Sequence, residues 1–311
     1  MKKVFMVCLA LLLVIPFAFA SGNAESESGS MLMGFTCMDQ TNPFQIAMKD
    51  AIQTGVEAHG DSLIAIDSYA SQLKQNDAID DMITRGIKVL FLNPVDQDGV
   101  KPALLACQEA GVKVIVIDSG VADPELTETY VSSNNYQAGA INGQQMLAAF
   151  PDGAKVALID NPLAESVVSR LAGLQDTLAG TNIEIIGISH YSTTDKILPT
   201  FEDFLQTYPD LDILWGLNDD VGLIAQGVVE SAGLTDQIKV FTVDGSPSCK
   251  QSIAKGGVYA TAAQSPTAIG EKAVELAYEV LAGNPVEKTY SIETVSITAE
   301  NIADYDLTAW L

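Results

Sequence analysis

Asparagine, aspartate and glutamine residues stand directly after six short apolar runs of this 311-residue chain. They are Asn93, Asp118, Asp160 with Asn161, Asn218, Asp244 and Gln264. If the runs are parallel strands, these side chains share the carboxyl edge of a sheet, where open α/β sheets bind ligands. Carboxylates accept hydrogen bonds and amides both donate and accept them, which is the mixture that a neutral polyhydroxylated ligand requires.

Each of these positions also has a purely structural interpretation. An Asp or Asn after a strand commonly caps the next helix or forms a turn, and for a single residue this is the stronger interpretation. Asp96, Asp219 and Asp220 are accordingly predicted to be caps or first-turn acids. The same chemistry at six strand ends favours a binding site for the set as a whole.

The apolar runs have the length and composition of strands that are buried on both faces, because they lack strict polar alternation. They cover residues 32–37, 63–66, 89–92, 114–117, 156–159, 183–188, 213–217, 240–243 and 259–263. Helix-like segments lie between them, among them 164–178, 221–232 and 267–281. This alternation predicts a doubly wound α/β architecture, and the number of strands predicts two lobes rather than one sheet.

A polar cluster, Ser132–Asn135, marks the predicted break between the two lobes. The N-terminal lobe is predicted to contain residues 31–133 plus 265–293, and the C-terminal lobe residues 134–264 plus 294–311. A last strand, Tyr290–Ile297, does not fit the parallel pattern. We expect it to pair along an edge or to cross between the lobes.

The composition of the N-terminal residues predicts an export signal. Lys2 and Lys3 precede an apolar stretch that ends in the A-x-A motif Ala18–Ala20, so residues 1–20 are predicted to be a signal peptide that is cleaved after Ala20. Residues 21–30 contain nothing to bury and are predicted to be a flexible leader. The mature protein is therefore expected in the periplasm.

The formal charge of −24 argues against nucleic acid and anionic membrane surfaces as partners. After the signal, Cys37, Cys107 and Cys249 remain, far apart and without a CxxC motif, and His59 and His190 are the only histidines. We therefore expect no metal site and no cofactor, and buried free thiols are favoured over a single disulfide.

At the strand ends the chain resembles a known family, the ribose-binding-protein type of periplasmic sugar-binding proteins of ABC transporters. The resemblance covers about residues 31–297 and depends on the order of several short phrases. These include Asn42-Pro43-Phe44, Leu92–Asp96, Val116–Asp118, Ser133–Asn135, Arg170, Asn218–Asp220, Val243–Pro247 and Gln264. It implies the class I periplasmic binding protein fold, in which two Rossmann-like lobes are joined by a three-strand hinge.

The resemblance also implies a set of ligand contacts. Asn42, Phe44, Asn93 and Asp118 would bind from the N-terminal lobe, and Arg170, Asn218, Asp244 and Gln264 from the C-terminal lobe and the hinge. The ring of Phe44 would stack on the apolar face of the ligand. The three hinge crossings would fall near Ser133–Asn134, Gln264–Ser265 and Glu293.

Three positions depart from the family pattern. Ser119 stands where an Arg is common, Gln45 where a second aromatic is common, and Met38 with Asp39 at a polar position of the first strand. Tyr191 or Ser192 would replace an aromatic of the second lobe. By contrast, Trp215 is predicted to be a core residue and His190 a turn residue.

The predicted function is therefore that of a substrate-binding protein, a monomer that closes on a neutral monosaccharide or related polyol and delivers it to a membrane permease. A nucleoside, an autoinducer or another small polar ligand is the alternative, and a chemoreceptor is a further possible partner. An enzyme that uses Asp118 and Asp244 on a glycoside is disfavoured, because no nucleophile elbow or phosphate-binding loop is present.

Overall fold

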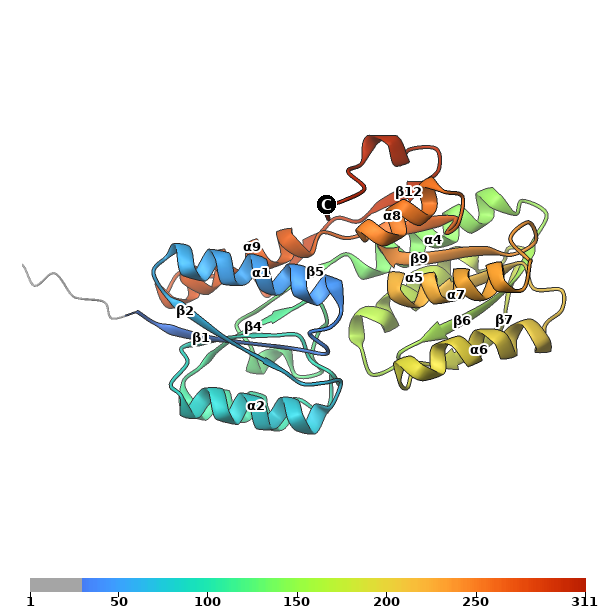
Figure 1. The fold of residues 1–311 in the computed structure, drawn as a ribbon. Helices are drawn as coiled ribbons and strands as arrows, with labels where there is room; N and C mark the ends of the chain where they lie inside the picture. Colours follow the sequence, from blue (N-terminus) through green and yellow to red (C-terminus); the bar gives the residue numbers. More distant parts are fainter. Residues whose placement is uncertain (1–29) are drawn as a thin grey trace, which may run out of the picture.

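The computed structural model describes residues 30–311, which form two α/β lobes that lie side by side (Figure 1). The two lobes were predicted from the sequence, and each contains a six-stranded sheet. The predicted signal peptide and residues 21–29 of the predicted leader lie outside the described residues. Within residues 30–311, no helix has the length and apolar character that crossing a membrane requires.

The sheet of the first lobe is entirely parallel, with the order β11-β5-β4-β3-β1-β2. Its strands are β1 (Leu32–Cys37), β2 (Ser62–Asp67), β3 (Val89–Leu92), β4 (Lys113–Ile117), β5 (Thr129–Ser133) and β11 (Thr289–Ile292). Its helices are α1 (Pro43–Ala58), α2 (Gln72–Thr84), α3 (Lys101–Ala110) and α9 (Pro266–Leu281), and η1 (Pro124–Leu126) is a short 3-10 turn.

Alternate residues of the central strands serve two separate cores. Val89 and Phe91 of β3 pack into the cluster that contains α1 and α9, whereas Leu90 and Leu92 pack into the cluster that contains α2 and α3. Successive side chains of a strand point to opposite faces, so a strand with helices on both sides must be apolar throughout. This explains why these runs show no polar alternation.

The sheet of the second lobe has the order β12-β10-β9-β8-β6-β7, in which only β12 runs antiparallel, to β10. Its strands are β6 (Ala154–Asp160), β7 (Ile183–His190), β8 (Ile213–Gly216), β9 (Lys239–Asp244), β10 (Ala260–Ala263) and β12 (Val295–Thr298). Its helices are α4 (Asn135–Ala149), α5 (Glu165–Leu178), α6 (Thr194–Thr207), α7 (Asp219–Ser231) and α8 (Pro247–Ala254), and η2 (Ile302–Asp304) is a 3-10 turn.

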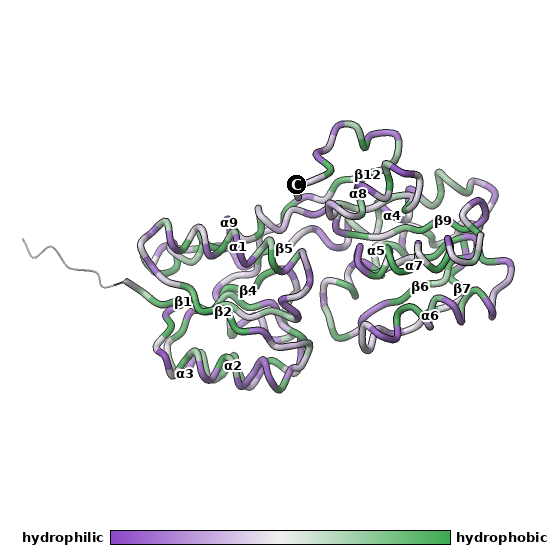
Figure 2. The backbone as a smooth tube through the Cα atoms, in the orientation of Figure 1, coloured by the Kyte–Doolittle hydropathy of each residue, from purple (hydrophilic) through white to green (hydrophobic). Residues whose placement is uncertain are grey.

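The hydrophobic core of the second lobe confirms one prediction about an aromatic residue. Trp215 of β8 is fully buried, and its indole Nε1 donates to Asn142 Oδ1 of α4 at 2.9 Å. It is a core residue and not a ligand contact. Figure 2 shows the same distribution along the backbone, with hydrophobic residues gathered on strands such as β6 and β9.

The chain passes between the two sheets three times, between β5 and α4, between β10 and α9, and between β11 and β12. The predicted single strand at 290–297 is instead two strands, which Glu293 and Thr294 separate. β11 extends the edge of the first sheet in parallel, and β12 extends the edge of the second in antiparallel fashion. The predictions that this segment pairs along a sheet edge and crosses between the lobes are both confirmed. The prediction of a single strand is wrong, because the segment forms two.

The segment after β12 contacts both lobes. Lys250 of α8 donates to the carbonyls of Asp306 and Ala309, at 2.5 Å each, which anchors the segment to the second lobe. Trp310 then packs edge-on against Phe44 of the first lobe, with ring centroids 5.6 Å apart. Residues near 310 therefore contact the first lobe, although the sequence assigned 294–311 to the second.

Two glycines allow α4 and α5 to approach closely beside the hinge. A Cβ on Gly139 would lie 1.8 Å from the carbonyl oxygen of Arg170, and one on Gly173 would lie 2.0 Å from that of Tyr136. Backbone on the opposing helix cannot move aside as a flexible side chain can. The contact also fixes the part of α5 that carries Arg170.

We expect Gly139→Ala to lower the free energy of unfolding by about 2 kcal/mol, because the added methyl must separate the two helices. Gly227→Ala is the matched control, since Gly227 is exposed in α7 and a Cβ there meets nothing within 4 Å. The control should raise stability by about 0.5–1 kcal/mol. Urea denaturation measures both, and equal effects would contradict the close-packing argument.

Candidate functional site

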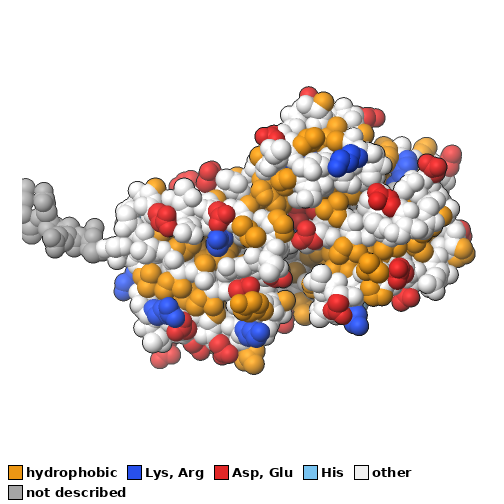
Figure 3. Space-filling model, viewed as in Figure 1, with side chains coloured by type: hydrophobic (Ala, Val, Ile, Leu, Met, Phe, Trp, Pro, Cys, Tyr) orange, Lys and Arg blue, Asp and Glu red, His pale blue; other side chains and the backbone are white. Residues whose placement is uncertain are grey.

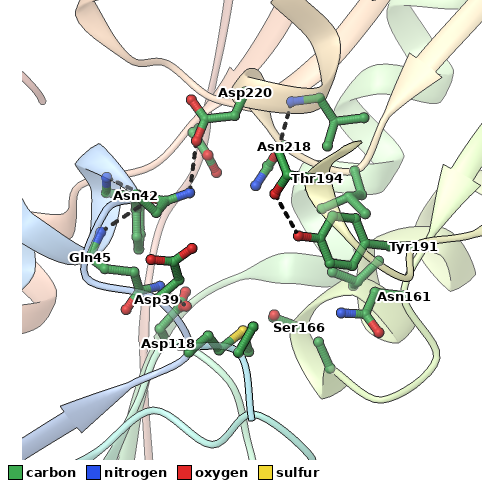
Figure 4. Close-up of a pocket in the computed structure, with 18 of the residues that line it drawn as sticks. Asp39, Asn42, Gln45, Asp118, Asn161, Ser166, Tyr191, Thr194, Asn218 and Asp220 are labelled. Carbon is green, nitrogen blue, oxygen red and sulfur yellow. Dashed lines mark hydrogen bonds between the residues drawn. The ribbon is translucent and has the colours of Figure 1, made fainter. Parts of the chain in front are cut away.

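A cleft of about 360 Å³ lies between the lobes, at the carboxyl ends of strands from both sheets (Figure 3). The first lobe lines it with side chains that include Asp39, Asn42, Gln45 and Asp118. The second lobe contributes Asn161, Tyr191, Asn218 and Asp220 (Figure 4). It also contributes Arg170 and Asp244, and Gln264 comes from the connection between β10 and α9. Its size is within the range of about 300–1,000 Å³ that is typical of small-molecule sites.

The structure places seven of the eight predicted site residues on this cleft. They are Asn42, Phe44, Asp118, Arg170, Asn218, Asp244 and Gln264. Asn93 is the exception, because it is fully buried behind the cleft wall. Its amide donates to Asp118 Oδ2 at 2.8 Å and to Gln45 Oε1 at 2.9 Å. Asn93 is thus placed to position the two side chains that reach the cleft.

Asp118 presents an acceptor without a protein partner. Its Oδ2 accepts from Asn93 and, at 3.2 Å, from Gln45 Nε2, whereas its buried Oδ1 has no partner among the described residues. The backbone φ of +62° turns the chain sharply at the end of β4, and Asp and Asn tolerate this region better than most residues. Burial raises the pKa of Asp118, and the guanidinium of Arg170 opposes that rise.

Arg170 lies at the centre of the second lobe's contribution. Its Nε donates to Asn135 Oδ1 at 2.8 Å, and one terminal nitrogen donates to the carbonyl of Leu217 at 2.9 Å. The same nitrogen lies 3.9 Å from Asp244 Oδ1. Burial raises the pKa of Asp244 well above its usual range, and the charge of Arg170 opposes the rise.

Gln264 completes this buried group. Its Nε2 donates to Asp244 Oδ1 at 2.6 Å, and its backbone nitrogen donates to the Asp244 carbonyl at 2.8 Å. Gln264 Oε1 is buried and, among the described residues, without a donor. Two residues that line the cleft therefore carry a buried, unpaired acceptor, Asp118 with Oδ1 in the first lobe and Gln264 with Oε1 at the hinge.

Asn42 and Asn218 are at once helix caps and cleft residues. Asn42 Oδ1 accepts from the backbone nitrogens of Phe44 and Gln45, and Asn218 Oδ1 accepts from that of Val221. Capping occupies only the oxygen of each amide. The nitrogen of Asn42 crosses the cleft and donates to Asp220 Oδ2 at 2.9 Å.

Phe44 is less available than the sequence suggested. It is 4 % exposed and packs in the core of the first lobe, with Trp310 against its edge. It lines the cleft as part of the wall. Tyr191 also lines the cleft, and its hydroxyl lies 3.2 Å from Thr194 Oγ1 (Figure 4).

The structural interpretation is confirmed for Asp96 and Asp219 and is incomplete for Asp220. Asp96 accepts from two backbone nitrogens of its own turn, and Asp219, in the first turn of α7, is buried and accepts from Ser246 N and Thr261 Oγ1. His190, predicted to be a turn residue, is instead the last residue of β7, where it contacts Asp160 away from the cleft. Asp220, predicted only as a first-turn acid, faces the cleft. The missed signal is its position two residues after Asn218, at the same strand end.

Direct contacts between the lobes close one margin of the cleft. Ser119 Oγ accepts from the backbone nitrogen of Ser166 at 3.1 Å. Glu165 Oε2 accepts from the hydroxyl of Tyr130 at 3.0 Å and from the nitrogen of Gly120 at 3.2 Å. Ser119, where the family pattern often has an arginine, thus joins the lobes and adds no cation to the cleft.

The cysteines agree with the prediction of buried free thiols. Cys37, Cys107 and Cys249 are all buried and unpaired in the described structure. Burial raises the pKa of Cys107 to about 12 and raises the pKa values of the other two. Across residues 30–311, His, Cys, Asp and Glu side chains form no cluster of three that could hold a metal ion.

Comparisons with known proteins agree with this arrangement. The family model described as a periplasmic binding protein domain matches residues 33–285. The ribose import binding protein of Escherichia coli (strain K12) is 29% identical over 279 residues, which covers 89% of this chain and 92% of that protein.

Solved structures of binding proteins share the fold. An ABC transporter solute-binding protein from Mycobacterium smegmatis, with bound glycerol, has a TM-score of 0.82 and 33% identity, and the match covers 89% of this chain and 96% of that one. The Caulobacter myo-inositol binding protein, bound to myo-inositol, has a TM-score of 0.82 and 26% identity with the same coverage. Because the family model spans most of the chain, and because the cleft lies where such proteins are expected to bind, this chain belongs to the periplasmic binding protein family, as a non-enzymatic substrate-binding protein of the ribose-binding type.

Proposed function

We propose that this protein is the substrate-binding component of an ABC importer and that it binds a monosaccharide or related polyol in the cleft. The observation that carries the proposal is the pair of buried, unpartnered acceptors, Asp118 Oδ1 and Gln264 Oε1. A buried acceptor without a donor costs about 1–3 kcal/mol, so the bound ligand is expected to bring donors. Hydroxyl groups around a small ring or chain supply them on several sides.

Contacts from both lobes give the binding its mechanism. Asp118 comes from the first lobe, and Arg170 and Asp244 from the second, so a ligand that touches all three is fully held only when the lobes are together. Ligand then shifts the population toward the closed arrangement, because only that arrangement offers both sets of contacts. The permease would recognise the closed shape.

The aromatic residues favour a polyol over a nucleoside. A nucleobase is commonly held between exposed aromatic faces, whereas the ring of Phe44 is packed in the core against Trp310. Tyr191 is the other aromatic side chain that lines the cleft. We further propose that the protein is exported to the periplasm as a monomer and delivers its ligand to a permease. The similarity to the ribose import binding protein supports the import role. A chemoreceptor is proposed as a second partner.

A thermal-shift panel tests this function. Pentoses, hexoses, pentitols and inositols are each added in large excess, with a parallel set of nucleosides. We expect at least one polyol to raise the melting temperature by about 5 °C, since ligand at 100 times Kd adds about 2.7 kcal/mol. A shift with nucleosides alone would favour the alternative ligand class, and no shift with any compound would contradict the proposal.

A further inference from the structure

The charges on the cleft wall do not balance. Its charged side chains in the described structure are one cation, Arg170, and four carboxylates, Asp39, Asp118, Asp220 and Asp244. Figure 3 shows acidic side chains at the hollow between the lobes. Burial raises the pKa values of Asp118 and Asp244, so the negative charge that a neutral ligand would leave uncompensated lies mainly on Asp39 and Asp220.

The charge of Arg170 acts on two of the four carboxylates. Arg170 lies 3.9 Å from Asp244, and its charge acts on both Asp244 and Asp118. It also donates to Asn135 and Leu217, which fixes its guanidinium deep in the second lobe. Its charge is therefore not available to the outer pair of carboxylates.

Asp39 and Asp220 form that outer pair, one from each lobe. Figure 4 shows the Asn42 amide between them, on one side of the cleft. Asn42 donates to Asp220 Oδ2, and Asp39 Oδ1 accepts from the nitrogen and hydroxyl of Thr41. These donors are neutral, so the two negative charges meet no cation in the described residues. Burial and the charge of Asp39 raise the pKa of Asp220.

Two unpartnered atoms of residues that line the cleft have the same preference for a donor. Gln264 Oε1 and Asp118 Oδ1 belong to residues that are at least nine-tenths buried, and both are acceptors. A ligand that donates hydrogen bonds and carries positive charge complements this wall best. An ammonium group does both, with three donors and one charge.

We infer that the preferred ligand is a monosaccharide-sized polyol that carries a protonated amine, such as an amino sugar or an amino alditol, with its ammonium group on the cleft side of Asp39 and Asp220. This inference rests on the proposed function and departs from the neutral ligand that the sequence predicts. Asp220 is exposed to solvent at the cleft mouth, which screens the interaction. The amine is therefore expected to add selectivity to a binding site that polyol hydroxyls also engage.

The test compares matched pairs in which only the amine changes. Calorimetry measures the full-length mature protein with glucose and glucosamine, galactose and galactosamine, and glucitol and glucamine, at low ionic strength and at a pH where the amine is protonated. We expect the amine of at least one pair to bind about tenfold more tightly than its hydroxyl counterpart. The preference should shrink as salt is added, because salt screens exposed charges.

Two variants test whether Asp39 and Asp220 cause the preference for the amine. Asp39→Asn and Asp220→Asn should each lower the amine-to-hydroxyl affinity ratio to about twofold, because each removes one of the two facing charges. Asp236→Asn changes the net charge equally at an exposed position that does not line the cleft, and should leave the ratio unaltered.

The outcomes separate the two proposals. If a neutral polyol binds and no amine binds more tightly than its partner, the inference is wrong and the proposed function stands. An amine preference that survives both aspartate variants, or that Asp236→Asn removes as well, would also overturn it. If no member of any pair and no compound of the thermal-shift panel binds, both proposals fail.

Discussion

Replacing Arg170 with methionine should lower the free energy of unfolding by about 3–5 kcal/mol at neutral pH, the range for a buried charge pair that loses one partner. Arg170 is 4 % exposed, and its charge opposes the desolvation of Asp118 and Asp244. Methionine fills much of the same space, so the loss is mainly electrostatic. The carbonyl of Leu217 and the amide of Asn135 would also lose a donor.

The loss should depend on pH with a defined sign. The folded-state pKa values of Asp118 and Asp244 are raised, and removal of Arg170 raises them further. A carboxyl group with a raised folded pKa contributes stability at low pH that is lost as the pH rises through that pKa. The deficit of Arg170→Met should therefore be largest at neutral pH and should narrow as the pH falls. Burial also raises the pKa of the neighbouring Asp219, so its contribution has the same sign.

Urea denaturation across this pH range measures the effect, with Arg85→Met as the control. Arg85 pairs with Asp81 on the exposed surface of the first lobe, where an i,i+4 pair contributes about 0.3–0.5 kcal/mol. The control should change little at any pH. A deficit for Arg170→Met that is small, or that widens at low pH, would show that the guanidinium does not balance the two buried carboxylates.

The sequence predicted the location of the cleft because parallel topology fixes it. Side chains at or just after the end of a strand lie near the carboxyl edge of its sheet, and among them Asp118, Asn218, Asp244 and Gln264 line the cleft. Capping a helix and lining the binding cleft are not alternatives, because one residue can do both. An asparagine cap uses its oxygen and leaves its nitrogen free, as Asn42 shows by donating to Asp220.

The local sequence pattern does not predict contacts between residues that lie far apart in the chain. The family resemblance placed the ring of Phe44 against the ligand, whereas in the structure Trp310, from the far end of the chain, packs against its edge. Asn93 follows a strand as Asp118 does, yet it is fully buried, because Gln45 and Asp118 stand between it and the cleft. Which of several equivalent strand-end residues reaches the cleft is decided by packing, which the strand pattern does not encode.

Asp118→Asn should weaken ligand binding by about 1.5–3 kcal/mol, roughly 10- to 150-fold, with little loss of stability. Asparagine has the same shape and tolerates the φ of +62°. Its oxygen must face Asn93 and Gln45, because both present N–H groups to Asp118 Oδ2. Its nitrogen then takes the place of the unpartnered Oδ1, and a donor replaces a buried acceptor of this cleft-lining residue.

The variant thus reverses one hydrogen-bonding direction and leaves the packing unaltered. Removing a carboxylate whose pKa burial raises should leave stability at neutral pH equal or higher, so a binding loss cannot be attributed to unfolding. Asp96→Asn is the matched control, an acid of the same lobe that accepts from its own turn and does not line the cleft. Calorimetry with the best polyol of the thermal-shift panel measures both variants. Wild-type affinity in Asp118→Asn would mean that the ligand does not donate to Asp118, and the donor-rich ligand proposed for this cleft would lose its main support.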